Sequence, residues 1–380
     1  MNLINRDFDP ITMQHDLELL HSFPNFPVFM GCSSKDESSD LMADMNWFIS
    51  KSSGLIQLNP LIPANVLYKN QHGSGCVGAI WLQHHQAFAE FVEKFSPNNI
   101  LEIGGGHGIL SREFKKIPHA SWVILEPNPD PAEGVDARYI KGFFDENFSL
   151  EDPVDAIVHS HVFEHIYYPD QFIKNLGKFL TTGKRLIFSI PNMKVMLNRK
   201  YNNCLNFEHT IFLTEPYVEY LLGKYGFELV EKKYFLDDHS IFYSYQKIDS
   251  FILKALPPNL YQINKEIFLN YITHYKNLVD TINSKLDLVG KRKEIFIFGA
   301  HIFTQYLIEF GLNVSKITGI LDNDKNKQGK RLYGTKLMVF SPEVLKNFDL
   351  PFVILKAGAY SSEIKDQILK QINHNTLFLE

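Results

Sequence analysis

The chain has 380 residues, of which 45% are hydrophobic and 21% charged, and its net charge at pH 7 is −5. This length predicts two or three domains, and the composition is typical of a soluble globular protein. The acidic balance and the lack of a long basic run argue against a nucleic-acid partner.

The cysteines Cys32, Cys76 and Cys204 are odd in number and far apart, which argues against a disulfide framework and for a reducing compartment. The first residues contain no basic segment followed by an apolar one, and no uncharged apolar stretch is long enough to cross a bilayer. We therefore expect a cytoplasmic protein without a membrane partner, as a monomer or a homodimer.

Residues 1–75 show little hydrophobic periodicity. The segment Phe23–Pro27 is rich in proline, Ser33–Ser39 is a polar run, and Gly54–Pro60 carries further turn residues. We expect loops and short strands in this region rather than a helix bundle.

From Trp81 onward, apolar runs alternate with helical patterns, which predicts an α/β fold with a parallel sheet. The expected strands are 99–103, 121–126, 155–158 and 185–190, and the expected helices are 81–95 and 217–225.

The segment 99–108 (N-I-L-E-I-G-G-G-H-G) predicts a buried strand that runs into a tight turn and then a helix. Glu102 precedes the turn, and Gly104, Gly106 and Gly108 follow at every second position. Glycine lets the backbone turn sharply and lie close to a ligand. The E-x-G-x-G-x-G pattern resembles motif I of class I S-adenosylmethionine methyltransferases. A glycine-rich turn without a ligand is the alternative.

Glu126 ends the second strand, about 22 residues after Gly104, where Rossmann-type sheets place a carboxylate on the ribose hydroxyls. Taken with the glycine pattern, this acid favours S-adenosyl-L-methionine over NAD. We expect Asn128 and the Gly142–Phe143 segment to line the adenosine, and His161 to contact the cofactor.

The third strand leads into 161–166 (H-V-F-E-H-I), at the edge where α/β sheets bind ligands. His165 is thus placed to face the methyl group, as a contact or as a proton-transfer group. The alternative is that it only braces the loop.

Glu208 and His209 lie past the fourth strand, in a long insertion before the helix at Tyr217. Such insertions build the acceptor side in methyltransferases. An imidazole can accept a proton from a hydroxyl or from carbon next to a ketone. We therefore interpret His209 as the base, oriented by Glu208, although adjacent residues of an extended segment point to opposite sides. A helix-capping or solvated pair is the alternative.

Residues 263–288 predict a long amphipathic connector helix, and a second β–α unit then opens at 295–300 (I-F-I-F-G-A). It continues with a strand that ends at Asp322, so the chain holds two nucleotide sites, or one site and a structural copy. The predicted domains are an N-terminal region (1–75), a methyltransferase core (76–248), the connector (249–290) and a Rossmann-like C-terminal domain (291–380).

The chain resembles, distantly but nearly end to end, the sugar C-methyltransferases that methylate nucleotide-linked 4-keto deoxysugars. Gly54–Leu58 matches the family's G-L-x-Q-L segment, and Asn206–His209 (N-F-E-H) falls on Y-H-E-H. Asp322–Gly329 followed by Tyr333–Thr335 is similar to the family's C-terminal D-x-N-x-x-K-Q-G…P-G-T run. The resemblance also places Tyr68 in the region of an active-site tyrosine.

Departures from the family pattern change the expected chemistry. The family's N-terminal region binds zinc through C-x-x-C pairs, but Ser50–Ser53 replaces the second pair and Cys32 stands alone, so we expect no metal. Asn206 and Phe207 replace the tyrosine and first histidine of Y-H-E-H, and Asn206 cannot act as a phenolic acid or base. Phe303–Thr304 replaces a Lys-Gly pair, which removes a candidate phosphate contact.

The sequence therefore predicts an S-adenosyl-L-methionine-dependent methyltransferase that acts on carbon or oxygen of a sugar or nucleotide-linked sugar, in polysaccharide or secondary-metabolite biosynthesis. The candidate catalytic residues are His209, Glu208, His165 and Tyr68. The candidate cofactor-binding residues are Glu102, Gly104, Gly106, Gly108, Glu126, Asn128, Phe143 and His161. One alternative is an NAD-dependent sugar-nucleotide oxidoreductase, but Gly299–His301 lacks the following glycines. The other is a non-catalytic cofactor-binding scaffold, against which the intact motif I argues.

Overall fold

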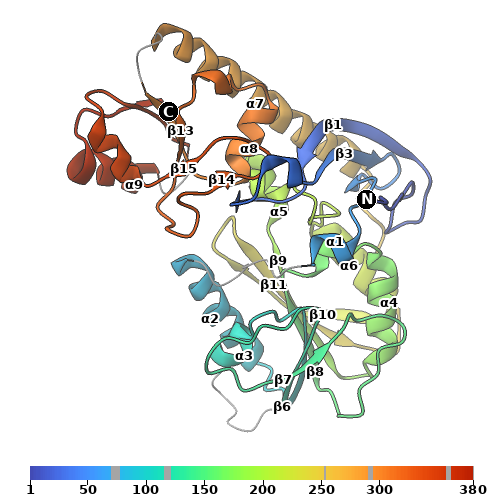
Figure 1. Cartoon of the computed structure of the whole chain (residues 1–380). Coiled ribbons are helices and arrows are strands. Elements are labelled where there is room, and N and C mark those ends of the chain that lie inside the picture. The colour runs from blue at the N-terminus through green and yellow to red at the C-terminus, as the bar shows by residue number, and fades with distance from the viewer. Residues whose placement is uncertain (70–77, 115–120, 252–253, 290–293, 357–360, 380) are drawn as a thin grey trace. The chain divides into compact units, whose positions relative to one another are not determined.

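The computed structural model describes residues 1–69, 78–114, 121–251, 254–289, 294–356 and 361–379. It divides into two compact units (Figure 1). The first unit consists of residues 1–20 and 47–266, and the second of residues 21–46 and 267–380. In this division both units share the first 75 residues, which the sequence groups as one region. Among the described helices, none combines the length and apolar character that a membrane span requires.

A seven-stranded sheet is the centre of the first unit, in the order β10-β11-β9-β8-β5-β6-β7. Its strands are β5 (Asn99–Ile103), β6 (Ser121–Glu126), β7 (Arg138–Lys141), β8 (Ala156–Ser160), β9 (Arg185–Pro191), β10 (Phe227–Phe235) and β11 (Ser240–Lys247). β7, β6, β5, β8 and β9 pair in parallel, whereas β11 pairs antiparallel with both β9 and β10. Parallel pairing brings the carboxyl ends of five strands to one edge, where such sheets bind ligands.

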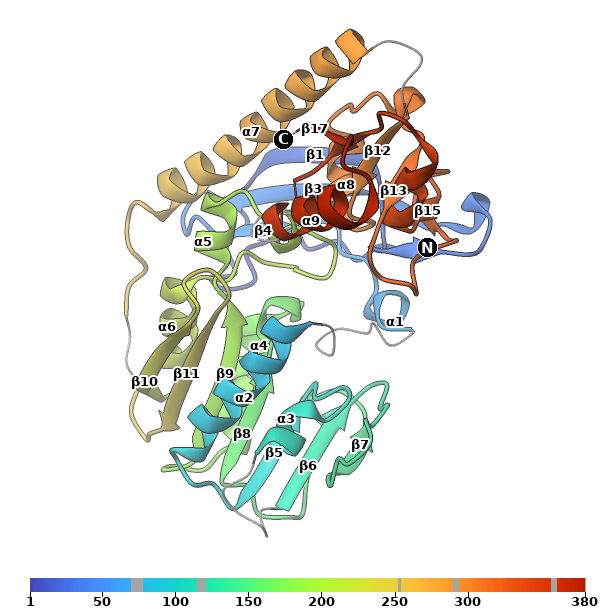
Figure 2. The same cartoon turned by 90° about the vertical axis from the view of Figure 1, so that its left-hand side faces the viewer.

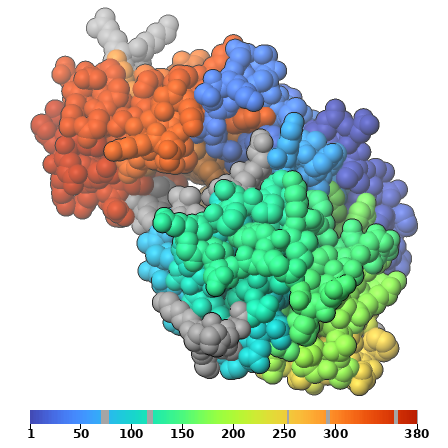
Figure 3. Space-filling model, turned by 60° about the horizontal axis from the view of Figure 1, so that its bottom comes forward, coloured from blue at the N-terminus to red at the C-terminus, as the bar shows by residue number. Residues whose placement is uncertain are grey.

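Helices cover both faces of this sheet, α2 (Ala79–Glu93) and α3 (Ile109–Glu113) on one face and α4 (Pro169–Phe179) and α6 (Glu215–Lys224) on the other (Figures 1 and 2). Strands covered on both faces need continuous apolar runs. β8 and β9 have such runs, with Ala156, Ile157 and Val158 fully buried in β8. The short helices α1 (Ala64–Leu67) and α5 (Met193–Asn198) and 3₁₀ turns at Phe163–His165 and Asn202–Cys204 complete this unit. The surface formed by the segment between β6 and α4 is coloured in green tones in Figure 3.

The predicted α/β class and the expected strands of the core are therefore confirmed. The hairpin of β10 and β11 was not predicted. Most of β10 is exposed or half-buried, so it lacks the apolar run that marks the central strands.

The N-terminal residues form a three-stranded sheet in the order β1-β3-β4, from β1 (Leu17–Pro27), β3 (Met42–Ser50) and β4 (Ile56–Leu58). The expectation of short strands was wrong for β1, which has 11 residues. Its residues are mostly half-buried with no clear alternation, so hydrophobic periodicity could not reveal it. Two of the three boundaries between the units fall inside β1 and β3, and the third falls inside the helix α7 (Leu260–Val289).

The second unit contains a parallel five-stranded sheet in the order β15-β13-β12-β16-β17. Its strands are β12 (Ile295–Phe298), β13 (Gly319–Leu321), β15 (Val339–Phe340), β16 (Phe352–Ile354) and β17 (Leu377–Leu379), and its helices are α8 (Ile302–Glu309), α9 (Ser361–Gln367) and a π-helical turn at Ile368–Ile372. The predicted connector is the helix α7 (Leu260–Val289), whose Val279, Ile282 and Leu286 pack in the same apolar cluster as Ile295 and Ile297 of β12.

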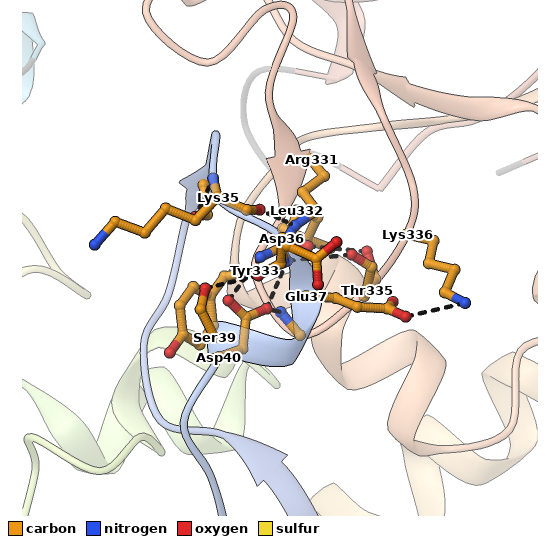
Figure 4. Close-up of polar contacts among 12 residues, drawn as sticks. Lys35, Asp36, Glu37, Ser39, Asp40, Arg331, Leu332, Tyr333, Thr335 and Lys336 are labelled. Carbon is orange, nitrogen blue, oxygen red and sulfur yellow. Dashed lines mark hydrogen bonds and ion pairs between the residues drawn. The ribbon is translucent and has the colours of Figure 1, made fainter.

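Residues 35–40 belong to the second unit through polar contacts with residues 331–336 (Figure 4). The short strand β2 (Cys32–Ser33) pairs antiparallel with β14 (Arg331–Leu332). Arg331, whose side chain is 9% exposed, donates from both terminal nitrogens to the carboxylate of Asp40, at 2.5 and 2.8 Å. Its Nε donates to the carbonyl of Lys35 at 2.7 Å. A buried bidentate pair of this kind fixes the register between the two segments.

Candidate active site

The glycine turn joins β5 to α3 at the carboxyl edge of the first sheet. Gly104, Gly106 and Gly108 have φ values of +71°, +48° and +73°, a region that favours glycine. A Cβ on Gly104 would lie 2.7 Å from Cγ2 of Val162, and one on Gly108 would lie 2.5 Å from the hydroxyl of Tyr139. A Cβ on Gly106 would meet no described atom within 4 Å. The outer glycines thus allow close packing, whereas Gly106 borders open space that suits a ligand.

Glu126, at the end of β6, lies beside this open space. Its Oε2 accepts a hydrogen bond from the N–H of Gly106 at 3.1 Å, and its Oε1 accepts one from the N–H of Asn128 at 3.0 Å. Each carboxylate oxygen can accept a second hydrogen bond. The carboxylate is therefore oriented by the backbone and keeps the capacity to bind a diol.

Glu102 differs from Glu126 because it is buried under the turn. Glu102 is only 3% exposed, and its Oε2 accepts a hydrogen bond from the indole N–H of Trp122 at 2.7 Å. A Cβ on Gly105 would lie 2.7 Å from its carboxyl carbon. Burial raises the pKa of Glu102 to about 7. Glu102 thus supports the turn from within the core.

Asn128 and Phe143, the other residues expected near the adenosine, lie in the loops after β6 and β7. The side-chain amide of Asn128 donates to the carbonyl of Tyr68, which ties the cofactor edge to the segment that carries the candidate tyrosine. Phe143 is 57% exposed. An exposed aromatic ring at this edge is available to cover the face of a base.

His161 follows β8 with φ +53°, a value uncommon for a residue other than glycine. Its Nε2 lies 2.9 Å from the hydroxyl oxygen of Ser240, and its Nδ1 lies 3.4 Å from Oε1 of Glu164. The 3₁₀ turn after it directs Glu164 into the protein, where it is fully buried. Burial raises the pKa of Glu164 and holds the pKa of His161 well below its usual value.

The structure brings the candidate residues His165, His209 and Tyr68 together. The rings of His165 and His209 have centroids 5.0 Å apart and are nearly perpendicular. Nδ1 of His165 lies 3.2 Å from the hydroxyl of Tyr68. Burial lowers the pKa of His165 to about 4 and also lowers the pKa of His209. Both imidazoles are therefore neutral at pH 7.

A backbone carbonyl orients the ring of His209. Its Nδ1 lies 3.0 Å from the oxygen of Cys204, which can only accept a hydrogen bond, so the proton is on Nδ1 and Nε2 is basic. Oδ1 of Asn206 accepts hydrogen bonds from the N–H groups of Glu208 and His209, at 2.8 and 3.0 Å. Asn206 thus shapes the segment, and the carbonyl of Cys204 orients the ring of His209 in addition to the role that we predict for Glu208.

Arg6 holds the two loops that carry these histidines, although nothing in its sequence context indicates such a role. It is fully buried and donates to the carbonyls of Tyr167 and Thr210, both at 2.7 Å, and of Leu58 at 3.2 Å. Burial lowers its pKa to about 10, so it stays charged at neutral pH. Tyr167 and Thr210 lie within two residues of His165 and His209, which makes Arg6 a positioning residue.

The second Rossmann-like unit offers less to a dinucleotide. At the end of β13, Oδ2 of Asp322 accepts hydrogen bonds from the N–H of Ala300 at 2.9 Å and from Nζ of Lys327 at 3.0 Å. Its Oδ1 accepts from the N–H of Asp324 at 2.9 Å. Two donors of the chain already engage Oδ2, so this carboxylate offers less to a ribose diol than Glu126 does, which disfavours the oxidoreductase alternative.

Residues 80–232 match the family model of a methyltransferase domain. The matched residues include the glycine turn and the strands β5 to β9, and the match ends within β10. The match bears out the expected methyltransferase, and its residues lie inside the segment 76–248 that the sequence assigns to the core. No curated protein matches the chain significantly.

Several solved structures are similar to part of this chain. N-methyltransferase NodS from Bradyrhizobium japonicum WM9 is 17% identical, with a TM-score of 0.34 over 44% of this chain and 96% of NodS. A possible histamine N-methyltransferase from Thermotoga maritima is 19% identical, with a TM-score of 0.35 over 43% of this chain and 89% of that protein. NodS has also been solved with S-adenosyl-l-homocysteine.

Proposed function

We propose that the protein transfers a methyl group from S-adenosyl-L-methionine to a carbon or a hydroxyl oxygen of a sugar or nucleotide-linked sugar. One observation carries the proposal: the loop after β8 contacts the glycine turn and also carries His165, which belongs with His209 to the histidine group of the site. Val162 of this loop lies against Gly104, and His165 follows three residues later. A cofactor at the turn and an acceptor at the histidines would therefore be neighbours.

The residues around Gly106 fit the cofactor. The open side of the turn leaves room for the ligand backbone, and Glu126 can accept hydrogen bonds from the ribose hydroxyls while it disfavours a 2′-phosphate. We place Asn128, Phe143 and His161 at the rim of this site. When bound, S-adenosyl-L-methionine supplies a methyl group activated by its sulfonium.

The histidine group provides the proton chemistry that an acceptor requires. A sugar hydroxyl, or a carbon next to a ketone, loses a proton as it gains the methyl group, and Nε2 of His209 is the neutral, basic atom available to accept it. The hydroxyl of Tyr68 contacts Nδ1 of His165, and we assign to Tyr68 the role of the family's active-site tyrosine. Alignment of two bound reactants contributes roughly 7–11 kcal/mol in such reactions.

The sugar class of the acceptor rests on the sequence resemblance, above all on the Asp322–Thr335 run and the Gly54–Leu58 segment. On the same basis we propose a cytoplasmic enzyme of polysaccharide or secondary-metabolite biosynthesis, active as a monomer or a homodimer. The four sequence-defined segments remain our proposal for its modular organisation.

Two experiments test this function. Calorimetry with S-adenosylhomocysteine and with NADH separates the alternatives, and we expect binding of the first only; binding of NADH alone would support an oxidoreductase. Mass spectrometry of a panel of nucleotide sugars incubated with the enzyme and S-adenosyl-L-methionine should show the gain of one methyl group. Cofactor binding without methylation of any sugar in the panel would contradict the acceptor class.

A further inference from the structure

Glu164 is a buried carboxyl group whose local contacts are incomplete. Neither of its oxygens accepts a hydrogen bond from a side chain that the structure describes, and the residue is fully buried. The basic atoms beside Oε1 are Nδ1 of His161 at 3.4 Å and Nε2 of His165 at 3.8 Å. A buried carboxylate with so few donors is strongly disfavoured unless it takes up a proton or a cation compensates it. With imidazoles beside it, this position suits a bound cation.

The histidines that face Glu164 are held by their other ring nitrogen, as metal-binding histidines usually are. Nδ1 of His165 contacts the hydroxyl of Tyr68, and Nδ1 of His209 contacts the carbonyl of Cys204. The carbonyl of Cys204 fixes the tautomer of His209 and leaves its Nε2 without the ring proton. The ring of His165 is oriented by the hydroxyl of Tyr68 and by the backbone of Glu208, and its Nε2 lies 3.8 Å from Oε1 of Glu164.

We propose that Glu164, His165 and His209 form a binding site for one divalent transition-metal ion. One ligand atom from each lies within 4.8 Å of the others. Around an ion with bonds of about 2.1 Å, ligand atoms lie at most about 4.2 Å apart, so small side-chain adjustments close the site. Two imidazoles and one carboxylate favour ions such as Co²⁺ or Zn²⁺ over Mg²⁺ and Ca²⁺, which prefer oxygen ligands.

A second histidine group is a weaker candidate. His84, His161 and His239 also have ligand atoms within 4.8 Å of one another, but the group includes no carboxylate. Nε2 of His84 lies 3.0 Å from the hydroxyl of Ser189, and a nitrogen of each of the other two lies within 2.9 Å of the hydroxyl of Ser240. These contacts are like the outer partners of the first group, so the difference is that the second group includes no carboxylate that a cation would compensate.

This site differs from the zinc site whose absence the sequence predicts, because that prediction considered only the cysteines of the N-terminal region. Metal binding does not depend on the proposed function. Only the effect of the ion on the acceptor rests on that function. With the ion bound, Nε2 of His209 is a ligand, and the ion rather than the imidazole would favour loss of the acceptor proton. Binding itself is independent of any acceptor.

The test uses the full-length protein after treatment with a chelator. Titration with Co²⁺, followed by calorimetry and by visible absorption, should show about one ion per chain, and Co²⁺ should raise the melting temperature because it binds the folded state. Glu164→Gln and His209→Asn should each weaken Co²⁺ binding by about 100-fold or more, a larger loss than outer partners usually give. His239→Asn, from the second histidine group, is the matched control and should bind Co²⁺ as the unmodified protein does.

Absence of saturable Co²⁺ binding would overturn the proposal, as would binding that survives Glu164→Gln and is lost in His239→Asn. Circular dichroism of each variant verifies that it is folded. S-adenosylhomocysteine binding, measured on the same samples, separates the two conclusions. A protein that binds S-adenosylhomocysteine but not Co²⁺ refutes the metal site alone. A protein that binds Co²⁺ but not S-adenosylhomocysteine refutes the methyltransferase assignment alone.

Discussion

The open space at Gly106 leads to a prediction that separates ligand binding from backbone strain. Gly106→Ala adds one methyl group at φ +48°, where no described atom lies within 4 Å. The methyl group therefore enters without a clash, and the cost to the free protein is the left-handed backbone, about 1–2 kcal/mol. That methyl group occupies the space assigned to the cofactor. We expect S-adenosylhomocysteine affinity to fall at least about tenfold, which corresponds to about 1.4 kcal/mol.

Gly329→Ala is the matched control for this variant. Gly329 also has a positive φ, +77°, with no described atom within 4 Å of an added Cβ, but it belongs to the second unit. Both variants should lose a similar amount of stability in thermal unfolding, and only Gly106→Ala should lose affinity in calorimetry. If Gly106→Ala binds S-adenosylhomocysteine as well as Gly329→Ala does, the space at Gly106 is not the ligand's and the cofactor site must be placed elsewhere.

Three further predictions concern single carboxylates and the candidate base. Glu126→Ala should weaken S-adenosylhomocysteine binding by about 1.5–3 kcal/mol, because charge-assisted hydrogen bonds to the ribose are lost; unchanged affinity in calorimetry would contradict the ribose contact. His209→Asn should lower turnover by about 10²–10⁴-fold with nearly unchanged cofactor affinity, and full turnover in a methyl-transfer assay would remove His209 from the chemistry. The pKa of Glu102 is about 7 in the folded state and about 4.5 in the unfolded state. The protonated form therefore stabilises the fold below pH 4.5, and this contribution of about 3 kcal/mol to the free energy of unfolding is lost as the pH rises to 7 and above. Glu102→Gln keeps the acceptor for Trp122 and should flatten this dependence in urea unfolding between pH 4.5 and 8, whereas parallel pH profiles for the two proteins would refute the buried-carboxyl account.

Sequence reasoning identified those parts of the fold that carry their own local signal. The apolar runs of β5 and β6 and the long periodic pattern of α7 were predicted close to their observed bounds. β10 was missed because its outer side is solvated, and its place in the sheet depends on pairing with β11.

The residues of the candidate site also separate into those with a local sequence signal and those without one. Gly106 and Glu126 were found because a ligand-binding turn requires these residue types at a fixed spacing. Arg6 was missed because its importance comes from burial against three carbonyls that lie far away in sequence. The orientation of His209 by Cys204 was missed for a related reason, since a carbonyl partner leaves no trace in the pattern of side chains.

The discontinuous second unit has a consequence for how the chain matures during synthesis. Residues 21–46 belong to it, but its remaining residues begin at 267, more than 200 residues later. Phe23 and Phe26, each 1% exposed in the finished protein, pack on Tyr306, and Phe23 also packs on Phe310. At about 5–20 residues per second, these rings leave the ribosome roughly 14–57 s before their partners exist. During that interval the nascent chain presents an apolar segment to the cell, so the yield of the enzyme should depend on chaperones that shield it.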